Sequence, residues 1–538
     1  MYPEPYNSVE AVKKICVNFE HIRRVDLDRV LRLLRVEKNV AIVDQCSLYM
    51  ISFIAEILTK DNYANNREVY DACKNLLDFL AEKSNSEITG YQLTNLLQSA
   101  DRDETFIITL QALGPTMCKH HHQSFESWRS RSFSIIRRYL EEVDVPNQDP
   151  KKIIDLYKAI VKFYETTIDG TKNPELLKGM IPHLIQLLGN PLCFTQDASS
   201  KSLDIEFGKV MQKTVANIFR TMDDPLGFLQ HPPYMRFHPD ELAIAHLFYW
   251  VYCEGVCLQA VPKVYSPKFV FELSVALMCA LLESEHDGLV EKAIKLASRL
   301  LIPLKEEKWS HLLLELESTG QFISLLATTI VYNNTREIRQ MALTCLTTFI
   351  LQFDTTGVYL ILKHSLAVQS HSGLKGYLIT LYKDLIHREW GDDISEYLKG
   401  VHLKRFLSAC CRLKGDEDSN LSEDSEQIIS ALNLIRYLLL KDQNNVTQVA
   451  NWLALLEDSY LKPLKKSITL SRNRLEQDIR TPIDDQTMPK GELNLMVAGE
   501  KVEPSSEEER LASLKSSLAG LDVIESVLSR VVELLEEK

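Results

Sequence analysis

The sequence is poor in glycine and proline, with only 19 of each in 538 residues. An all-β architecture needs a turn about every ten residues, and long disordered chains are rich in these two residues, so both classes are excluded. An excess of basic residues is also missing, since 61 lysines and arginines face 74 aspartates and glutamates, for a net charge of −13. Such a charge repels phosphate backbones, so we expect no nucleic acid partner.

The chain also lacks an uninterrupted apolar stretch long enough to cross a bilayer. Its most apolar window, Leu242 to Val261, contains His246, Glu254 and Gln259, which favours a buried helix over a membrane span. The N-terminal residues do not show the basic flank and apolar run of a signal peptide. The cysteines, 11 in number, are scattered through apolar patterns, as expected for reduced thiols. We expect no membrane association and a cytoplasmic location, with the nucleus as a second compartment.

Motifs of enzymes are absent from the sequence as well. It has no phosphate-binding GxxxxGK[ST] or GxGxxG loop, no GxSxG elbow and no HExxH pair. The segment from Cys118 to His122 could place only two ligands on one helical face, so a solvated tract is favoured over a metal site. Cys410-Cys411 has no nearby histidine or aspartate, and His246 is expected to be a hydrogen-bonded core histidine. We predict a protein that is not an enzyme and holds no cofactor or metal.

What the sequence does contain is helical periodicity along nearly its whole length. Three segments, starting at Arg67, Leu289 and Arg336, share a polar turn, a small residue near the helix start and an apolar stripe. The last two align Ala293 with Ala342, and the period is about 40 to 50 residues, within the range of HEAT-like repeats. This pattern predicts an all-α, HEAT-like helical-repeat solenoid (an α-α superhelix).

Two segments interrupt this pattern before the C-terminal region. Residues 221–240 place prolines and a glycine between helical segments, which predicts an irregular crossing. The crossing divides the chain into an N-terminal helical-repeat half, residues 1–225, and a C-terminal half, residues 226–538. Residues 414–426 are acidic and poor in apolar side chains, which predicts a mobile loop.

A third interruption lies near the C-terminus, where residues 480–509 contain three prolines and cannot form one helix. Within this segment, apolar residues alternate with polar or flexible ones: Leu493, Leu495 and Val497. The alternation predicts a short extended segment or hairpin near residues 490–503. The chain then continues in a long predicted helix, Leu511 to Glu537.

The segment from Ser425 to Leu464 carries an unusual helix. One of its faces is apolar, with Ile428, Leu432, Ile435 and Leu439 at helical spacing. The other side carries Asn433, Arg436, Tyr437 and Leu440. An arginine, an aromatic ring and an amide together are typical of a protein-contact patch. From side-chain chemistry alone, packing of Tyr437 and Leu440 on the next helix of the stack is the favoured alternative.

Several C-terminal segments resemble the glomulin family: SALNLIRYL (Ser430 to Leu438), Lys441-Asp442, LKPL (Leu461 to Leu464) and LDVIESVLSRVVEL (Leu521 to Leu534). Thinner, collinear similarities extend upstream to the segments around Glu254, Lys292 and Arg67. The resemblance implies a HEAT-like solenoid whose C-terminal repeats clamp the RING domain of the RING-box subunit of cullin–RING ubiquitin ligases. The clamp covers the docking surface of the ubiquitin-conjugating enzyme and inhibits ubiquitin transfer.

Under this resemblance, the region from about residue 426 to residue 538 binds the RING-box protein with its cullin, and any zinc belongs to the RING partner. The free protein is expected to be a monomer. The candidate contact residues lie on two predicted helices: Asn433, Arg436, Tyr437, Asp522, Glu525, Ser526 and Ser529. The alternative function is a general scaffold that binds a signalling receptor or kinase through its N-terminal half.

Overall fold

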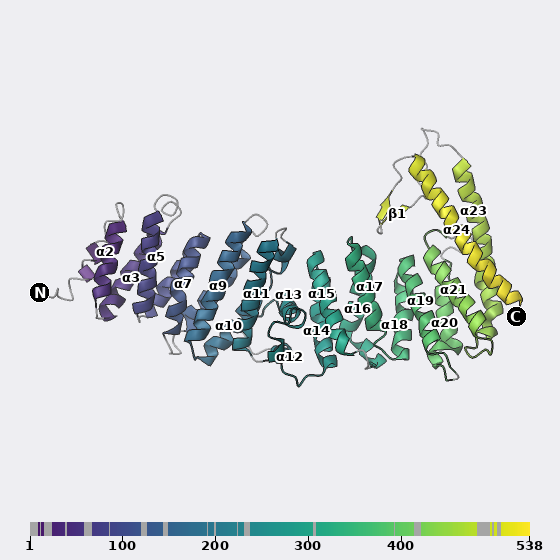
Figure 1. The fold of residues 1–538 in the computed structure, drawn as a ribbon, viewed down its shortest axis with the longest axis horizontal. Helices are drawn as coiled ribbons and strands as arrows, with labels where there is room; N and C mark the ends of the chain where they lie inside the picture. The colour runs from purple at the N-terminus through teal and green to yellow at the C-terminus, as the bar shows by residue number, and fades with distance from the viewer. Residues whose placement is uncertain are drawn as a thin grey trace. The chain divides into compact units, whose positions relative to one another are not determined.

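The computed structural model describes residues 9–10, 12–14, 24–37, 40–58, 67–84, 87–119, 126–143, 149–190, 192–197, 201–222, 224–230, 237–304, 308–391, 393–413, 421–480, 495–497, 500–502 and 507–537. The chain divides into two compact units, Met1–Leu300 and Leu301–Lys538 (Figure 1). The expected division between residues 225 and 226 therefore falls inside the first unit.

In the first unit, the helices pack in two layers. One layer consists of α2 (Arg24–Val36), α5 (Arg67–Lys83), α7 (Asp103–Cys118), α9 (Pro150–Gly170) and α11 (Lys201–Thr221). The other layer consists of α3 (Val40–Ile57), α6 (Glu87–Ser99), α8 (Glu126–Glu141), α10 (Pro174–Gln186) and α13 (Glu241–Tyr252). The unit also contains α12 (Pro225–Gln230), α14 (Pro267–Leu282) and α15 (Asp287–Leu301). Tandem helices that each pack on the next confirm the predicted helical-repeat architecture.

Several of these helices begin with the same local device, a polar cap followed by proline. The Asp149 side chain accepts a hydrogen bond from the backbone N–H of Lys151 at 3.0 Å, and the Asn173 and Ser266 side chains cap α10 and α14 in the same way. Each cap satisfies a donor that the first helical turn leaves unpaired, while the following proline supplies a φ angle suited to a helix.

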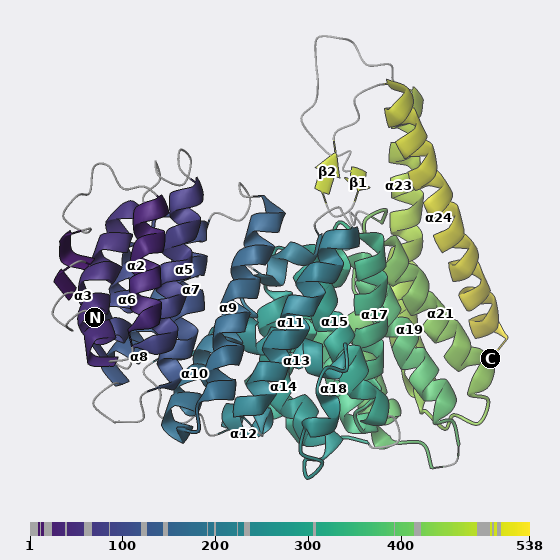
Figure 2. The ribbon, with the colours of Figure 1, turned by 60° about the vertical axis from the view of Figure 1, so that its left-hand side comes forward.

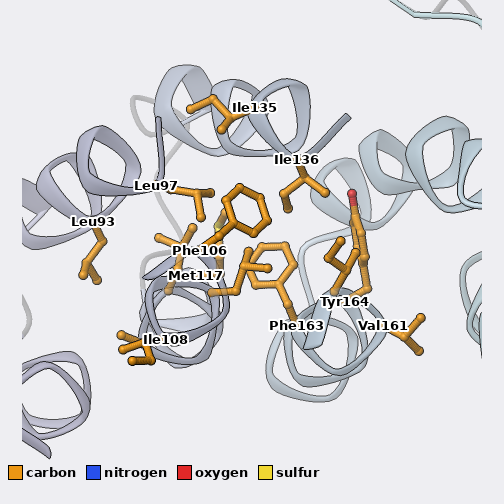
Figure 3. Packing of buried hydrophobic residues seen from close by; sticks show 14 of the residues in the cluster. Leu93, Leu97, Phe106, Ile108, Met117, Ile135, Ile136, Val161, Phe163 and Tyr164 are labelled. Atoms are coloured by element: carbon orange, nitrogen blue, oxygen red, sulfur yellow. The ribbon is translucent and has the colours of Figure 1, made fainter. Parts of the chain in front are cut away.

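The core of the first unit is a continuous apolar layer between the helices. Phe106 and Met117 of α7 point toward Phe163 of α9 and Ile136 of α8 (Figure 3). The Phe106 ring also stacks on Tyr139, with ring centroids 3.9 Å apart. Amphipathic helices therefore bury their stripes on their neighbours, as the sequence periodicity predicts.

A buried polar network explains why the first unit continues past residue 225. His246 of α13 hydrogen-bonds through Nδ1 to the carbonyl of Leu188 at 2.6 Å, and Lys292 of α15 reaches His246 Nε2 and the carbonyl of Cys193, each at 3.1 Å. Because a carbonyl only accepts, Nδ1 carries the proton and Nε2 accepts from the lysine. The expectation of a hydrogen-bonded core histidine is confirmed.

The apolar window that contains α13 does not form one long helix. The helix ends at Tyr252, and the backbone turns at Gly255 (φ 74°) and Cys257 (φ 55°). Cys253 and Cys257 are therefore not one helical turn apart, and both are half-buried. Among the described residues, one helix, α3, is long and apolar enough to cross a membrane, and half of it is buried within the unit, as in a core helix.

The second unit is also a stack of helices. They are α16 (Glu317–Tyr332), α17 (Arg336–Ile350), α18 (Thr355–Val368), α19 (Ser372–Arg388), α20 (Gly400–Cys410), α21 (Ser425–Lys441), α22 (Leu453–Leu456), α23 (Lys462–Arg480) and α24 (Glu507–Glu536), with a π-helical turn at Glu457–Leu461. In this unit, α21 packs on α19 and α24, and α23 lies alongside α24 (Figures 1 and 2).

Two predictions for the C-terminal region are confirmed by the structure. The strands β1 (Leu495–Val497) and β2 (Glu500–Val502) form an antiparallel hairpin within the predicted segment (Figure 2). The last helix, α24, covers nearly the predicted range and buries Leu514, Leu521, Ile524, Leu528 and Val531. Most of the loop predicted at residues 414–426 lies outside the described residues, and α21 begins at Ser425.

Candidate partner-binding surfaces

Helix α21 has neighbours on two sides, so only part of its circumference meets solvent. Its apolar stripe, including Ile428, Leu432 and Ile435, is fully buried against α19 and α24. Gly376 of α19 permits close approach, because a Cβ there would lie 2.8 Å from the backbone oxygen of Glu426. The tight packing fixes which α21 residues face outward.

Tyr437 packs on α19, as the structural alternative predicts. Its hydroxyl shares a 3.1 Å hydrogen bond with His387 Nδ1, and its ring meets the Trp390 ring edge-on at 6.3 Å. Lys441 lies 5.8 Å from the Trp390 ring centroid. Burial, and then the nearby Asp384 carboxylate, raise the pKa of Tyr437, so its hydroxyl stays protonated. The tyrosine is nevertheless only half-buried, so part of its side chain remains accessible to a partner.

The other residues of this helix differ in exposure. Arg436 is exposed, Asn433 is half-buried, and Leu440 is 50% exposed. Half of the Leu440 surface is therefore accessible to solvent. The outward surface of α21 and the end of α19, which we call the α21 surface, comprises His387, Trp390, Arg436, Tyr437, Leu440 and Lys441.

The four candidates on α24 face away from its buried stripe. Asp522 and Glu525 both pair with Arg472 of α23, at 2.7 and 2.6 Å. The Ser529 hydroxyl donates to the Glu525 carbonyl within the same helix at 2.9 Å, and Ser526 is exposed. The two carboxylates thus already have an intramolecular cation, and a partner's basic residue would have to share or displace it.

The candidates do not form a single cluster. Tyr437 is directed to α19, whereas Asp522 and Glu525 are directed to α23. Sequence reasoning missed His387, Trp390 and Lys441 beside Tyr437, and Arg472 beside the carboxylates. Among these residues, only Trp390 gave a signal in the sequence, since tryptophan is enriched among interface anchors.

Side chains suited to catalysis or metal binding are not gathered in the described part of the chain. No three histidine, cysteine or acidic residues there are placed to hold a metal ion. Of the tract from Cys118 to His122, the three histidines lie outside the described residues. Cys410 and Cys411 are buried with sulfurs 3.9 Å apart, and their mutual hydrogen bond, together with burial, raises the pKa of Cys411. Such a thiol is poorly suited to act as a nucleophile.

Comparison with known proteins shows similarity to one family. Residues 258–521 match the profile of a family described as "Uncharacterised protein family, YAP/Alf4/glomulin". Glomulin of Mus musculus is 24% identical over 553 aligned residues, covering 95% of this chain and 91% of that protein. Glomulin of Homo sapiens is 24% identical over 549 residues, with the same coverage.

The chain is therefore similar to the YAP/Alf4/glomulin family over residues 258–521 and to glomulin along nearly its whole length. Among solved structures, a "Circular tandem repeat protein with novel repeat topology and enhanced subunit contact surfaces" aligns over 99% of this chain and 98% of that chain, with 10% identity and a TM-score of 0.18. That similarity is too low to support an argument.

Proposed function

We propose that this protein, which is similar to glomulin, clamps the RING domain of the RING-box subunit of cullin–RING ubiquitin ligases and thereby inhibits ubiquitin transfer. The supporting observation is the similarity to glomulin combined with an exposed arginine, Arg436, and the Tyr437–Trp390 ring pair, all within the matched segment. Arginine and aromatic side chains dominate the binding energy of many protein interfaces. The proposal implies a cytoplasmic or nuclear protein.

Inhibition by masking requires no active site. The protein must present a rigid surface that overlaps the docking surface of the conjugating enzyme. Rigidity of the α21 surface supports the proposal, because α21 packs on α19 and Tyr437 of α21 shares a hydrogen bond with His387 of α19. A preorganised anchor loses little conformational entropy on binding, which favours it over a weakly bound competitor.

The test is a binding measurement between the full chain and a purified RING-box–cullin pair. Substitution Arg436→Glu should weaken binding about tenfold or more, the loss expected for an anchoring arginine. Arg336→Glu is the matched control, because Arg336 is exposed at the start of α17 in the same unit. Equal binding by the two variants would show that the contact lies elsewhere on the chain. Absence of binding by the unmodified chain would refute the proposed function itself.

The inhibitory step has its own readout. Addition of the chain to a reconstituted cullin–RING ligase should reduce ubiquitin chain formation in a concentration-dependent way, and excess conjugating enzyme should restore it. Restoration is expected because two ligands that share one surface compete. Inhibition that excess conjugating enzyme does not reverse would argue against masking.

A further inference from the structure

The first unit carries a groove that the proposed RING-binding function does not use. It lies between α9 and α11, has a volume of about 530 Å³, and is lined by Lys158, Val161, Lys162, Glu165, Glu206, Lys209, Val210, Gln212, Lys213 and Ala216. Val161 and Val210 are fully buried and form an apolar floor, to which Ala216 adds. Val161 lies on the side of α9 turned away from Phe106 and Met117 of α7 (Figure 3).

Two ion pairs join the helices that form the groove. Lys158 pairs with Glu206 at 2.6 Å near one end, and Asp169 pairs with Arg220 near the other. Since both residue numbers increase together along the two helices, α9 and α11 run parallel (Figure 2). The walls of the groove are therefore the faces of two parallel helices, and the ion pairs between the helices fix their relative position.

The walls are basic although the whole chain is acidic. Each helix contributes a pair of lysines four residues apart: Lys158 and Lys162 on α9, and Lys209 and Lys213 on α11. With two glutamates among the lining residues, four lysines leave a local charge of +2, against −13 for the chain. Lysines at this spacing lie on one side of a helix, so their ammonium groups form two rows above the apolar floor.

The lysines are unequally neutralised. Glu206 accepts hydrogen bonds from Lys158 and, at 3.0 Å, from Lys209, and these contacts hold its pKa at about 2. Lys162 pairs with Glu165 of its own helix at 2.9 Å. Lys213 has no ion-pair partner among the described residues. Lys162 and Lys213 are exposed, and they face the groove from opposite walls, where a ligand carboxylate can reach them.

We propose that this groove binds a short acidic peptide segment with the pattern acidic–apolar–acidic. Neighbouring lysines in each row are about 6 Å apart along the helix axis, from four residues of about 1.5 Å rise. In an extended peptide, alternate residues are about 6.6 Å apart and point to the same side. The acidic side chains of such a segment therefore match the lysine spacing, while the apolar residue between them points to the floor of valines.

The same features disfavour other anionic ligands. Glu165 and Glu206 repel a densely charged polyphosphate, and the apolar floor provides no hydrogen-bond donors for its oxygens. Nucleic acid needs a long basic track, whereas the chain as a whole repels phosphates. A peptide suits the site because it combines separated charges with an apolar side chain.

The test is a titration of the full-length chain with labelled peptides centred on Glu-Leu-Glu, Gln-Leu-Gln or Glu-Ser-Glu. The Glu-Leu-Glu peptide should bind, and each of the other two should bind about fivefold to tenfold more weakly, because one loses the charges and the other the apolar anchor. Binding of Glu-Leu-Glu should also weaken at high salt, since exposed charges are screened.

Protein variants locate the site. Lys162→Glu with Lys213→Glu should abolish peptide binding, and the milder Lys162→Gln with Lys213→Gln should weaken it about fivefold. The matched control is Lys172→Glu with Lys178→Glu, two exposed lysines of the same unit outside the groove. Circular dichroism checks that every variant is folded.

Three results would overturn the proposal. The first is equal peptide binding by the groove and control variants. The second is no detectable binding of Glu-Leu-Glu at millimolar concentration. The third is tight, groove-dependent binding of inositol hexakisphosphate or single-stranded DNA in place of the peptide, which would assign the groove to a small polyanion or a nucleic acid.

Discussion

At the scale of single residues, the buried His246–Lys292 pair shows how a polar group is kept in a core. Both His246 nitrogens and the Lys292 ammonium have partners, so burial leaves no polar atom of the imidazole unsatisfied. Burial, and then the neighbouring Lys292 charge, lower the pKa of His246 to about 3, so the ring is neutral in the folded protein.

This shift predicts loss of stability in acid. The unfolded chain binds a proton on this histidine below about pH 6.5, whereas the folded chain does not until about pH 3, so stability falls as the pH drops through that window. From pH 7 to pH 5 the contribution is about 2 kcal/mol. His246→Gln can keep both hydrogen bonds without titrating, so urea unfolding of this variant should show a pH dependence smaller by about that amount. An unchanged pH dependence would mean that His246 has the same pKa in the folded and unfolded chains.

At the scale of elements, α24 is the helix on which the C-terminal surfaces depend. It spans 30 residues and attaches to α21 through a buried stripe that includes Ile524 and Leu528. Its polar face holds Arg472 of α23 through Asp522 and Glu525. These exposed ion pairs orient α23 and add little stability compared with the apolar stripe.

Truncation of the stripe should therefore loosen α24. Ile524→Ala removes a fully buried side chain and should cost about 2 to 5 kcal/mol. Backbone hydrogen exchange along α24 should be faster in this variant than in the unmodified chain, whereas exchange in the unit Met1–Leu300 should be unchanged. Val523→Ala is the matched control, because Val523 is the preceding residue of the same helix and is 50% exposed. Similar exchange in both variants would show that α24 is not held by its apolar face.

At the scale of the whole molecule, the two candidate surfaces belong to different compact units. The basic groove lies in the unit Met1–Leu300, and the α21 surface lies in the unit Leu301–Lys538. They share no residue, so substitutions in one should not change binding at the other.

This independence is testable with the two variant sets in one chain. Lys162→Glu with Lys213→Glu should leave affinity for the RING-box–cullin pair unchanged, and Arg436→Glu should leave peptide affinity unchanged. The combined variant should lose affinity for both ligands, each by the same factor as in the corresponding separate variant. A change of more than about threefold at the distant site would reveal coupling between the units.

Much of the architecture follows from the sequence alone. The all-α class, the stripe of α24, the breaks between α23 and α24 and the short hairpin are all predictable, because each depends on residues within one or two helical turns of one another. The similarity to glomulin can also be recognised from residues 430–464 and 521–534. The predicted extent of the helix after Leu242 was wrong, because the positive φ angles at Gly255 and Cys257 give no clear signal in an apolar run.

The tertiary structure decided which polar residues are free and which are already engaged. Tyr437 meets His387, Asp522 meets Arg472, and the lysines of α9 face those of α11 across 50 residues of chain. Such pairings depend on the relative positions of two packed helices, and that register is set by the interlocking of buried side chains. Local spacing tells which face of a helix is polar, and only packing tells what that face meets.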